Sequence, residues 1–160
     1  MRAVRYHDHG GTDVLQMDEI DRPTPAADEV LVDVEAAAVN PVDTYFREGS
    51  YQPAALPMIP GSDVAGTVAA VGDAVTEFDT GDRVFATGLG NDRQGTCAET
   101  VTVPTDRLAR LPDSVDARTG AASALVGVTA WQSLIAAGDL EPGARVLVHG
   151  GSGGVGHLAV

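Results

Sequence analysis

The sequence contains no lysine and has little positive charge of any kind. All 10 basic residues are arginine and 23 acidic residues oppose them, so the formal net charge is −13. A surface this acidic repels nucleic-acid phosphates and anionic lipid heads, which argues against nucleic-acid and membrane partners. The missing lysine has two explanations, a GC-rich genome and adaptation to high internal salt. We favour the halophilic explanation, because strong self-repulsion is tolerated best where salt screens it.

Cysteine and long apolar runs are also scarce. Cys97 is the single cysteine, so an internal disulfide is excluded and a reducing compartment is favoured. No stretch approaches the roughly 18 consecutive apolar residues of a membrane helix. The charged N-terminus lacks the apolar core of a signal peptide. We therefore expect a cytoplasmic protein.

Aromatic residues make up only 4% of the chain, whereas apolar residues as a whole make up 44%. This composition is sufficient for a buried core, and valine, alanine and leucine must fill most of it. A chain of 160 residues suits one domain, or one domain with part of another.

The first hundred or so residues have the pattern of short β-strands. In "EVLVDVEAAAV", Val30, Val32, Val34 and Ala36 lie on one face, and Asp33 and Glu35 lie on the other. Three more strand candidates lie at residues 63–75, 81–87 and 96–104, bounded by glycine and proline. This spacing predicts a compact barrel or sandwich. Residues 40–62 are poorly periodic, and loops of that length are usually functional or disordered.

The pattern changes to helical after Pro112. Ser114 or Asp116 could cap a helix whose apolar residues recur at helical spacing, with Trp131 expected in the core. Gly127 weakens its middle, so one helix and two short helices are equally expected. Residues 145–149, "RVLVH", read as a strand buried on both faces, as in a parallel sheet. We place a boundary near residues 113–118, between domains 1–115 and 116–160.

A glycine cluster, Gly151-Ser152-Gly153-Gly154-Val155-Gly156, follows this strand and fits G-x-G-x-x-G. Glycine permits the tight turn, the approach of backbone to a pyrophosphate, and close helix–strand packing. A glycine-rich tail would match the same pattern, but the preceding apolar run and a following helix start favour a cofactor loop. Such a βαβ unit takes about 30 residues, so we expect only its opening here.

Five stretches of the chain, taken in order, resemble the medium-chain dehydrogenase/reductase superfamily, and in particular its zinc-free quinone oxidoreductase (zeta-crystallin-like) branch. They are "AAVNPVDTYFREGSY", "IPGSDVAGTVAAVG", "GDRV", "GVTAWQSL" and "VHGGSGGVG". The resemblance implies a mainly β, GroES-like barrel domain, lacking a return segment, followed by the truncated start of an α/β Rossmann domain. It also implies a homodimer.

The activity implied by this resemblance is NAD(P)H-dependent, zinc-independent reduction of quinones or α,β-unsaturated carbonyls by hydride transfer. NADPH is the preferred cofactor by resemblance, and NAD is not excluded. The alternatives are an enoyl reductase of the same superfamily and a non-catalytic NADPH-binding protein. We expect the 160-residue chain alone to have little activity and to expose apolar surface.

We expect no metal site. Alcohol dehydrogenases of the superfamily carry Cys where this chain has Asn40, and His-Glu where it has Ser62-Asp63. Zinc needs three or four Cys, His or carboxylate ligands, and the one cysteine lies far in sequence from the histidines. Ser62-Asp63 is expected to form a tight turn. Without a Lewis acid, hydride transfer to an electron-poor acceptor is favoured over alcohol oxidation.

The resemblance places Asn40 in the acceptor pocket and Thr129 beside the nicotinamide. Tyr45 and Tyr51 are candidates to stack on the acceptor or donate to its carbonyl. Each has a structural alternative, namely turn chemistry for Asn40, loop packing for the tyrosines and a helix-backbone bond for Thr129. Asp43 is expected to be structural, Arg47 to pair with a carboxylate, and Cys97 to be inert. Cofactor contacts fall on Thr129 and on the loop residues Gly151, Gly153, Gly154, Val155 and Gly156.

Overall fold

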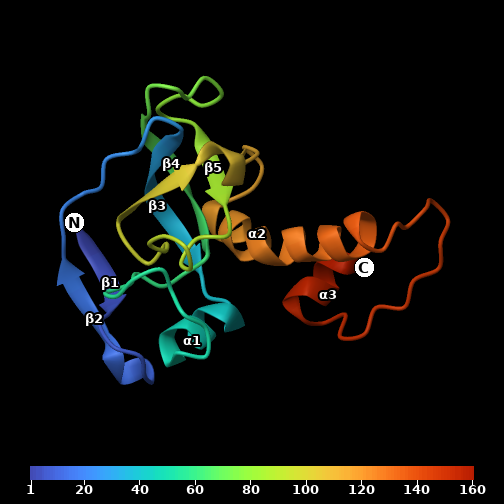
Figure 1. Cartoon of the computed structure of the whole chain (residues 1–160). Coiled ribbons are helices and arrows are strands. Elements are labelled where there is room, and N and C mark those ends of the chain that lie inside the picture. The colour runs from blue at the N-terminus through green and yellow to red at the C-terminus, as the bar shows by residue number, and fades with distance from the viewer.

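Figure 1 shows the computed structural model, which describes all 160 residues. A β-rich body holds most of the strands, and a long helix leads away from it to the C-terminal segment. The strands are β1 Arg2–Tyr6, β2 Leu15–Glu19, β3 Glu29–Ala38, β4 Asp63–Val71, β5 Arg83–Ala86, β6 Thr100–Pro104 and β7 Leu108–Arg110. The helices are α1 Pro41–Glu48, α2 Ala117–Trp131 and α3 Gly154–Ala159, with short 3-10 turns at Thr12–Val14 and Thr105–Arg107.

Five strands form an antiparallel sheet in the order β6-β3-β4-β5-β7. Val30 and Val32 are fully buried in the core and Asp33 is exposed, as the expected alternation requires, but Leu31 between the two valines is buried as well. The four strand candidates from the sequence correspond to β3, β4, β5 and β6. The core is valine-rich, as the composition predicts, with contributions from Phe78 and Leu89.

A hairpin of β1 and β2 packs beside this sheet and was not predicted. Its strands carry arginines and acids at several positions, which obscures their alternation. Isolated bridges from Ala3 to Ala98 and from Tyr6 to Met58 tie the hairpin to the rest of the body. Tyr6 is fully buried there. The short strand β7 was also not predicted.

The long segment at residues 40–62 contains α1, so the expectation of an irregular loop is wrong for its first part. Asn40 is the N-cap, Pro41 occupies the first helical position, and Asp43 completes a capping box. Gly49 ends the helix with a φ of 85°, a conformation that glycine adopts without a steric cost. Local cap signals therefore define α1, because eight residues are too few to show a period.

Helix α2 lies on the sheet through its N-terminal half. The Asp116 carboxylate accepts the backbone N–H of Thr119 at 2.8 Å, so one of the two predicted caps is confirmed. Gly120 and Ala121 allow a close approach to Ala65 of β4. The helix runs on into a single π-helical turn, Gln132–Ala136, and does not break at Gly127.

Trp131 is 65% exposed, so the prediction that it belongs to the core is wrong. The reason is visible in Figure 1, where the C-terminal half of α2 extends beyond the sheet. Val128 and Ile135 are exposed on the same part of the helix. The expectation that the bridge helix exposes apolar surface is confirmed.

Residues 145–149 form no strand, and Leu147 is 80% exposed, so the predicted doubly buried strand is absent. A parallel strand needs a neighbouring strand to satisfy its backbone, and no strand of this chain pairs with these residues. The segment instead runs as an extended connection to α3, which packs along α2 (Figure 1). No helix in the chain combines the length and the hydropathy that a membrane crossing requires.

Candidate active site

The candidate site is built around Asn40, which lies between the end of β3 and the start of α1. Its backbone N–H donates to Oδ2 of Asp43 at 2.7 Å, and this reciprocal contact completes the capping box at the start of α1. Asn40 is 8% exposed. The structural role expected for Asp43 is confirmed, and the turn-chemistry role of Asn40 is present as well.

The side chain of Asn40 reaches a second carboxyl group, that of Asp63. Asn40 Nδ2 donates to Asp63 Oδ2 at 2.8 Å. The sheet register explains the meeting, because Asp63 pairs with Ala38, two residues before Asn40. Asp63 is the first residue of β4 and is 1% exposed. The expectation of a tight turn at Ser62-Asp63 is therefore wrong.

Both carboxyl groups have a raised pKa. Burial is the largest cause for Asp43, the charge of Asp63 raises its pKa further, and the N–H of Asn40 partly offsets the rise. Burial also raises the pKa of Asp63, while its polar neighbours, the Thr87 side chain first and then the hydrogen-bonded Asn40 side chain, act in the opposite direction. Two acids thus face one neutral amide, and neither carboxyl forms an ion pair.

Tyr45 and Tyr51 lie together at the surface of α1 and the segment that follows it. Their rings are 5.5 Å apart in an edge-to-face arrangement, and Phe46 contacts Tyr51 at the same distance. The Tyr51 N–H donates to the Tyr45 carbonyl at 3.1 Å. Tyr45 is 44% exposed and Tyr51 is 51% exposed. The pair therefore packs internally and still presents aromatic surface to a ligand.

Thr129 lies on α2, and its hydroxyl donates to the Leu125 carbonyl at 2.7 Å. This is the helix-backbone bond that was expected as the alternative to a cofactor contact. The role of Thr129 beside a cofactor stays a prediction.

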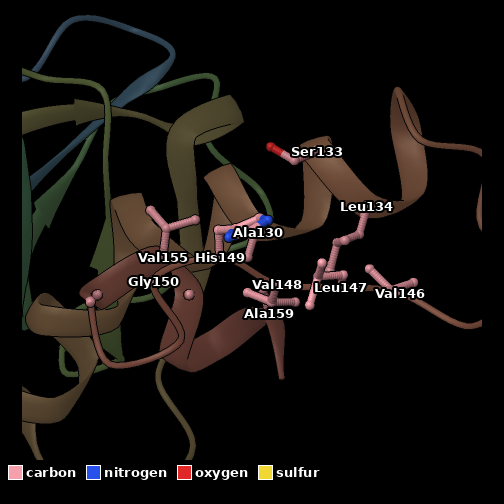
Figure 2. A pocket seen from close by; sticks show the side chains of 13 residues that line it. Ala130, Ser133, Leu134, Val146, Leu147, Val148, His149, Gly150, Val155 and Ala159 are labelled. Carbon is pink, nitrogen blue, oxygen red and sulfur yellow. The ribbon is translucent and has the colours of Figure 1, made fainter.

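The glycine cluster forms a turn that leads into α3, with Gly153 as the N-cap. Gly156 is buried, and a Cβ there would lie 2.2 Å from the Gly150 carbonyl oxygen, so close packing requires glycine. The loop borders a cavity of about 490 Å³. In Figure 2, Leu134 of the π-helical turn is directed toward Leu147. The lining also includes Ala130, Ser133, Val146, Val148, His149, Gly150, Gly153, Gly154, Val155, Gly156 and Ala159.

Residues 26–113 match the family model of the alcohol dehydrogenase GroES-like domain. The human quinone oxidoreductase is 43% identical over 161 residues, which cover 99% of this chain and 48% of the human protein. This chain belongs to the quinone oxidoreductase branch of the medium-chain dehydrogenase/reductase superfamily.

Solved structures agree with this assignment to the medium-chain dehydrogenase/reductase superfamily. The Escherichia coli quinone oxidoreductase in complex with NADPH superposes with a TM-score of 0.89 at 34% identity, over 99% of this chain and 48% of that chain. An alcohol dehydrogenase superfamily protein from Novosphingobium aromaticivorans superposes with a TM-score of 0.93 at 39% identity, with the same coverage. The chain thus spans about half the length of these relatives.

The superfamily assignment confirms the expected fold class, a GroES-like β domain followed by the opening elements of a Rossmann domain. The boundary between residues 115 and 116 stays a prediction. No group of three or more His, Cys, Asp or Glu side chains in this chain is placed to hold a metal ion. Asn40 and Asp63 are hydrogen-bonded to each other, at two of the three positions where the resemblance places Cys and His-Glu in the superfamily's alcohol dehydrogenases.

The two N-terminal histidines, Arg47 and Cys97 remain to be placed. His7 pairs with Asp18 at 2.8 Å, whereas Nδ1 of His9 faces the carbonyls of Phe46 and Arg47 at the end of α1. Arg47 pairs with the Glu48 carboxylate, as expected. Burial raises the pKa of the Cys97 thiol to about 11, which disfavours the reactive thiolate, and the inertness of this cysteine stays a prediction.

Sequence reasoning missed Asp63 as a site residue. The structure brings Asn40, Asp43 and Asp63 together and places the tyrosines on α1 and just beyond it. The glycine loop lies against the far part of α2, where Gly154 approaches Val126. One signal for Asp63 was available, namely a charged residue at the start of an otherwise apolar strand, where an isolated charge requires a partner.

Proposed function

We propose that this chain supplies the acceptor-binding part of an NADPH-dependent oxidoreductase that reduces quinones. The observations that carry the proposal are the hydrogen-bonded carboxamide of Asn40 at the start of α1 and the exposed aromatic pair of Tyr45, on α1, and Tyr51, just after it. A quinone presents a flat ring with carbonyl oxygens, so it needs an aromatic surface and a hydrogen-bond donor in one place. Relatives described as quinone oxidoreductases support the proposal.

Asn40 is the donor in this proposal. Its side-chain amide has two N–H groups, and it gives one of them to Asp63. The second N–H makes no other hydrogen bond to the protein and would donate to a carbonyl oxygen of the acceptor. Such a donor stabilises the negative charge that develops on that oxygen during reduction. The rings of Tyr45 and Tyr51 hold the acceptor plane through stacking.

The cofactor in this proposal is NADPH, which supplies the hydride when bound. The glycine loop, through Gly151, Gly153, Gly154, Val155 and Gly156, would approach its pyrophosphate, and Thr129 would lie beside the nicotinamide. The Gly156–Gly150 packing fits a dinucleotide loop. An NADPH complex of a quinone oxidoreductase that superposes on this chain supports the choice of cofactor, and NAD is the alternative.

A chimera tests the function directly. Residues 1–160 are joined to the complementary half of the Escherichia coli enzyme, and NADPH oxidation is followed with benzoquinone and, separately, with an enoyl thioester. We expect turnover of benzoquinone. Turnover of the thioester alone would favour enoyl reduction, and NADPH binding without turnover would favour a non-catalytic binding protein.

Matched variants test the roles proposed for Asn40 and Tyr51. Asn40→Ala should lower kcat with benzoquinone by about tenfold or more, because a donor to the developing oxyanion is lost. Asn91→Ala, which changes the only other asparagine, at an exposed position, is the control and should behave as wild type. Tyr51→Ala should raise KM for benzoquinone, whereas Tyr51→Phe keeps the ring and should not. The homodimer is part of the same proposal, and sedimentation of the chimera tests it.

A further inference from the structure

The buried polar cluster around Asn40 includes polar groups that the role of Asn40 as a hydrogen-bond donor does not require. Asp63 is 1% exposed and uses only one carboxyl oxygen, because Oδ1 has no hydrogen-bond partner. The Thr87 hydroxyl nearby is buried and also lacks a partner. A buried, incompletely paired carboxyl is expensive to keep. Because burial of this carboxyl is costly, we expect a role of Asp63 that offsets the cost.

We propose that Asp63 is a positioning residue, whose carboxyl accepts the side-chain N–H of Asn40 and so fixes the orientation of the Asn40 carboxamide. The proposal deepens the proposed function, because orientation of Asn40 matters only if Asn40 meets an acceptor. Asp63 itself does not touch that acceptor.

The side chain of Asn40 needs a hydrogen-bond partner from another element to fix its orientation. It lies in a two-residue connection between β3 and α1, and the preceding Val39 is 79% exposed. Asp43 holds the Asn40 backbone, at 2.7 Å, and Asp63 holds its side chain, at 2.8 Å. Removal of the Asp63 carboxyl frees the carboxamide to rotate, because the terminal torsion of asparagine is broad. A small misplacement of a reacting group is costly to the rate.

The strand that carries Asp63 is held on two sides. It pairs with β3, and Ala65, two residues along β4 from Asp63, contacts Ala121 of α2. This packing gives the Asp63 carboxyl a rigid base from which to hold the Asn40 side chain.

The first experiment uses this chain and needs neither cofactor nor substrate. NMR measures the hydrogen-exchange protection of the Asn40 side-chain amide in wild type and three variants. Asp63→Ala should lower the protection by about tenfold or more, because the buried bond is lost. Asp63→Asn keeps a carbonyl acceptor and should retain it. Ser62→Ala, which removes the neighbouring buried bond to the Leu89 carbonyl, is the control.

Equal loss of protection in the Ser62→Ala and Asp63→Ala variants would overturn the proposal, because Asp63 would then matter only through stability. An exchange of side chains covers the case in which Asp63→Ala does not fold. Asn40→Asp alone sets two carboxylates against each other and should lower the melting temperature. In the double variant Asn40→Asp with Asp63→Asn, the residue at position 63 becomes the donor and the residue at position 40 the acceptor. This variant should recover most of the loss in melting temperature. Additive losses in the double variant would contradict the pairing.

The kinetic readout separates this proposal from the proposed function. In the chimera, Asp63→Ala should lower kcat with benzoquinone by about tenfold or more while KM for NADPH changes little, and Ser62→Ala should leave kcat within about threefold. An unchanged kcat in Asp63→Ala would overturn the positioning role. A wild-type chimera without turnover would refute the proposed function, and the exchange measurement would still decide how Asn40 is held.

Discussion

Asp43 and Asp63 come from different elements and converge on Asn40, and the charge on Asp63 raises the pKa of Asp43. Burial contributes the largest part of the rise in both cases. The carboxyl groups of most surface acids in this chain are free or paired with arginine, as in Arg107–Asp92 at 2.7 Å. The site acids instead depend on a neutral amide, so their ionisation is linked to folding.

This linkage predicts a pH dependence of stability. A folded pKa above the ordinary value of 3.8 means that the folded state retains protons that the unfolded chain has released. The stabilisation is fully present below the unfolded pKa and is lost as the pH rises through the folded pKa. Asp63→Asn stays neutral, so its unfolding free energy relative to wild type should increase as the pH rises above the ordinary carboxyl pKa of 3.8 and through the raised pKa of the folded state. Denaturant unfolding at several pH values measures this.

Asp82 is the matched control, because its pKa shift has the opposite sign. The Asp79 N–H and then the Arg110 guanidinium lower the pKa of the Asp82 carboxyl. Its stabilisation is present above the unfolded pKa and is lost as the pH falls. Asp82→Asn should therefore lose stability relative to wild type as the pH rises. Parallel pH profiles for the two variants would contradict the assignment of the buried acids.

The packing of the glycine loop gives a second prediction. Gly156→Ala would place a Cβ 2.2 Å from the Gly150 carbonyl oxygen and 2.9 Å from the Gly151 Cα. These are backbone atoms, so the loop or α3 must move, at a cost of about 1–3 kcal/mol. Hydrogen exchange of the α3 amides should accelerate. Gly151→Ala is the control, because its Cβ would make an ordinary 3.6 Å contact with Val160. Equal exchange in the two variants would contradict this packing.

The charge balance predicts a salt response. With 23 acidic and 10 basic residues, repulsion between carboxylates exceeds what arginine pairs can offset. Exposed pairs such as Arg2–Glu99 contribute little stability each, and salt weakens them too. Screening of the larger repulsive contribution should dominate. The melting temperature should rise between low and molar KCl, and calorimetry measures it. A flat or falling curve would refute the halophilic interpretation.

The sequence was sufficient to predict features that depend on local patterns. Alternating valines located β3, the Asp116 cap located the start of α2, and the glycine spacing located a turn before α3. Resemblance then supplied Asn40 as a candidate for the acceptor pocket, a role that stays a prediction. In each case the signal lies within a few residues of the feature that it predicts.

Features that depend on distant partners were missed. Asp63 meets Asn40 because β3 and β4 pair in one register, and no local pattern contains that register. Residues 145–149 have the composition of a buried strand, but a strand forms only where another strand lies beside it. Trp131 has a helical apolar spacing, but its burial depends on how far the sheet extends under α2.

The position of α2 gives the last prediction. Trp131 is the only tryptophan and is 65% exposed, so its fluorescence should resemble that of a hydrated indole and iodide should quench it. Trp131→Gln should change the unfolding free energy by about 0.5 kcal/mol or less, as surface substitutions do. Ala121, on the same helix, is 1% exposed against Ala65 and Leu111. Ala121→Gln should cost several times more, because it inserts a polar side chain where the helix meets β4. Weak quenching and comparable costs in the two variants would show that α2 is rotated or covered.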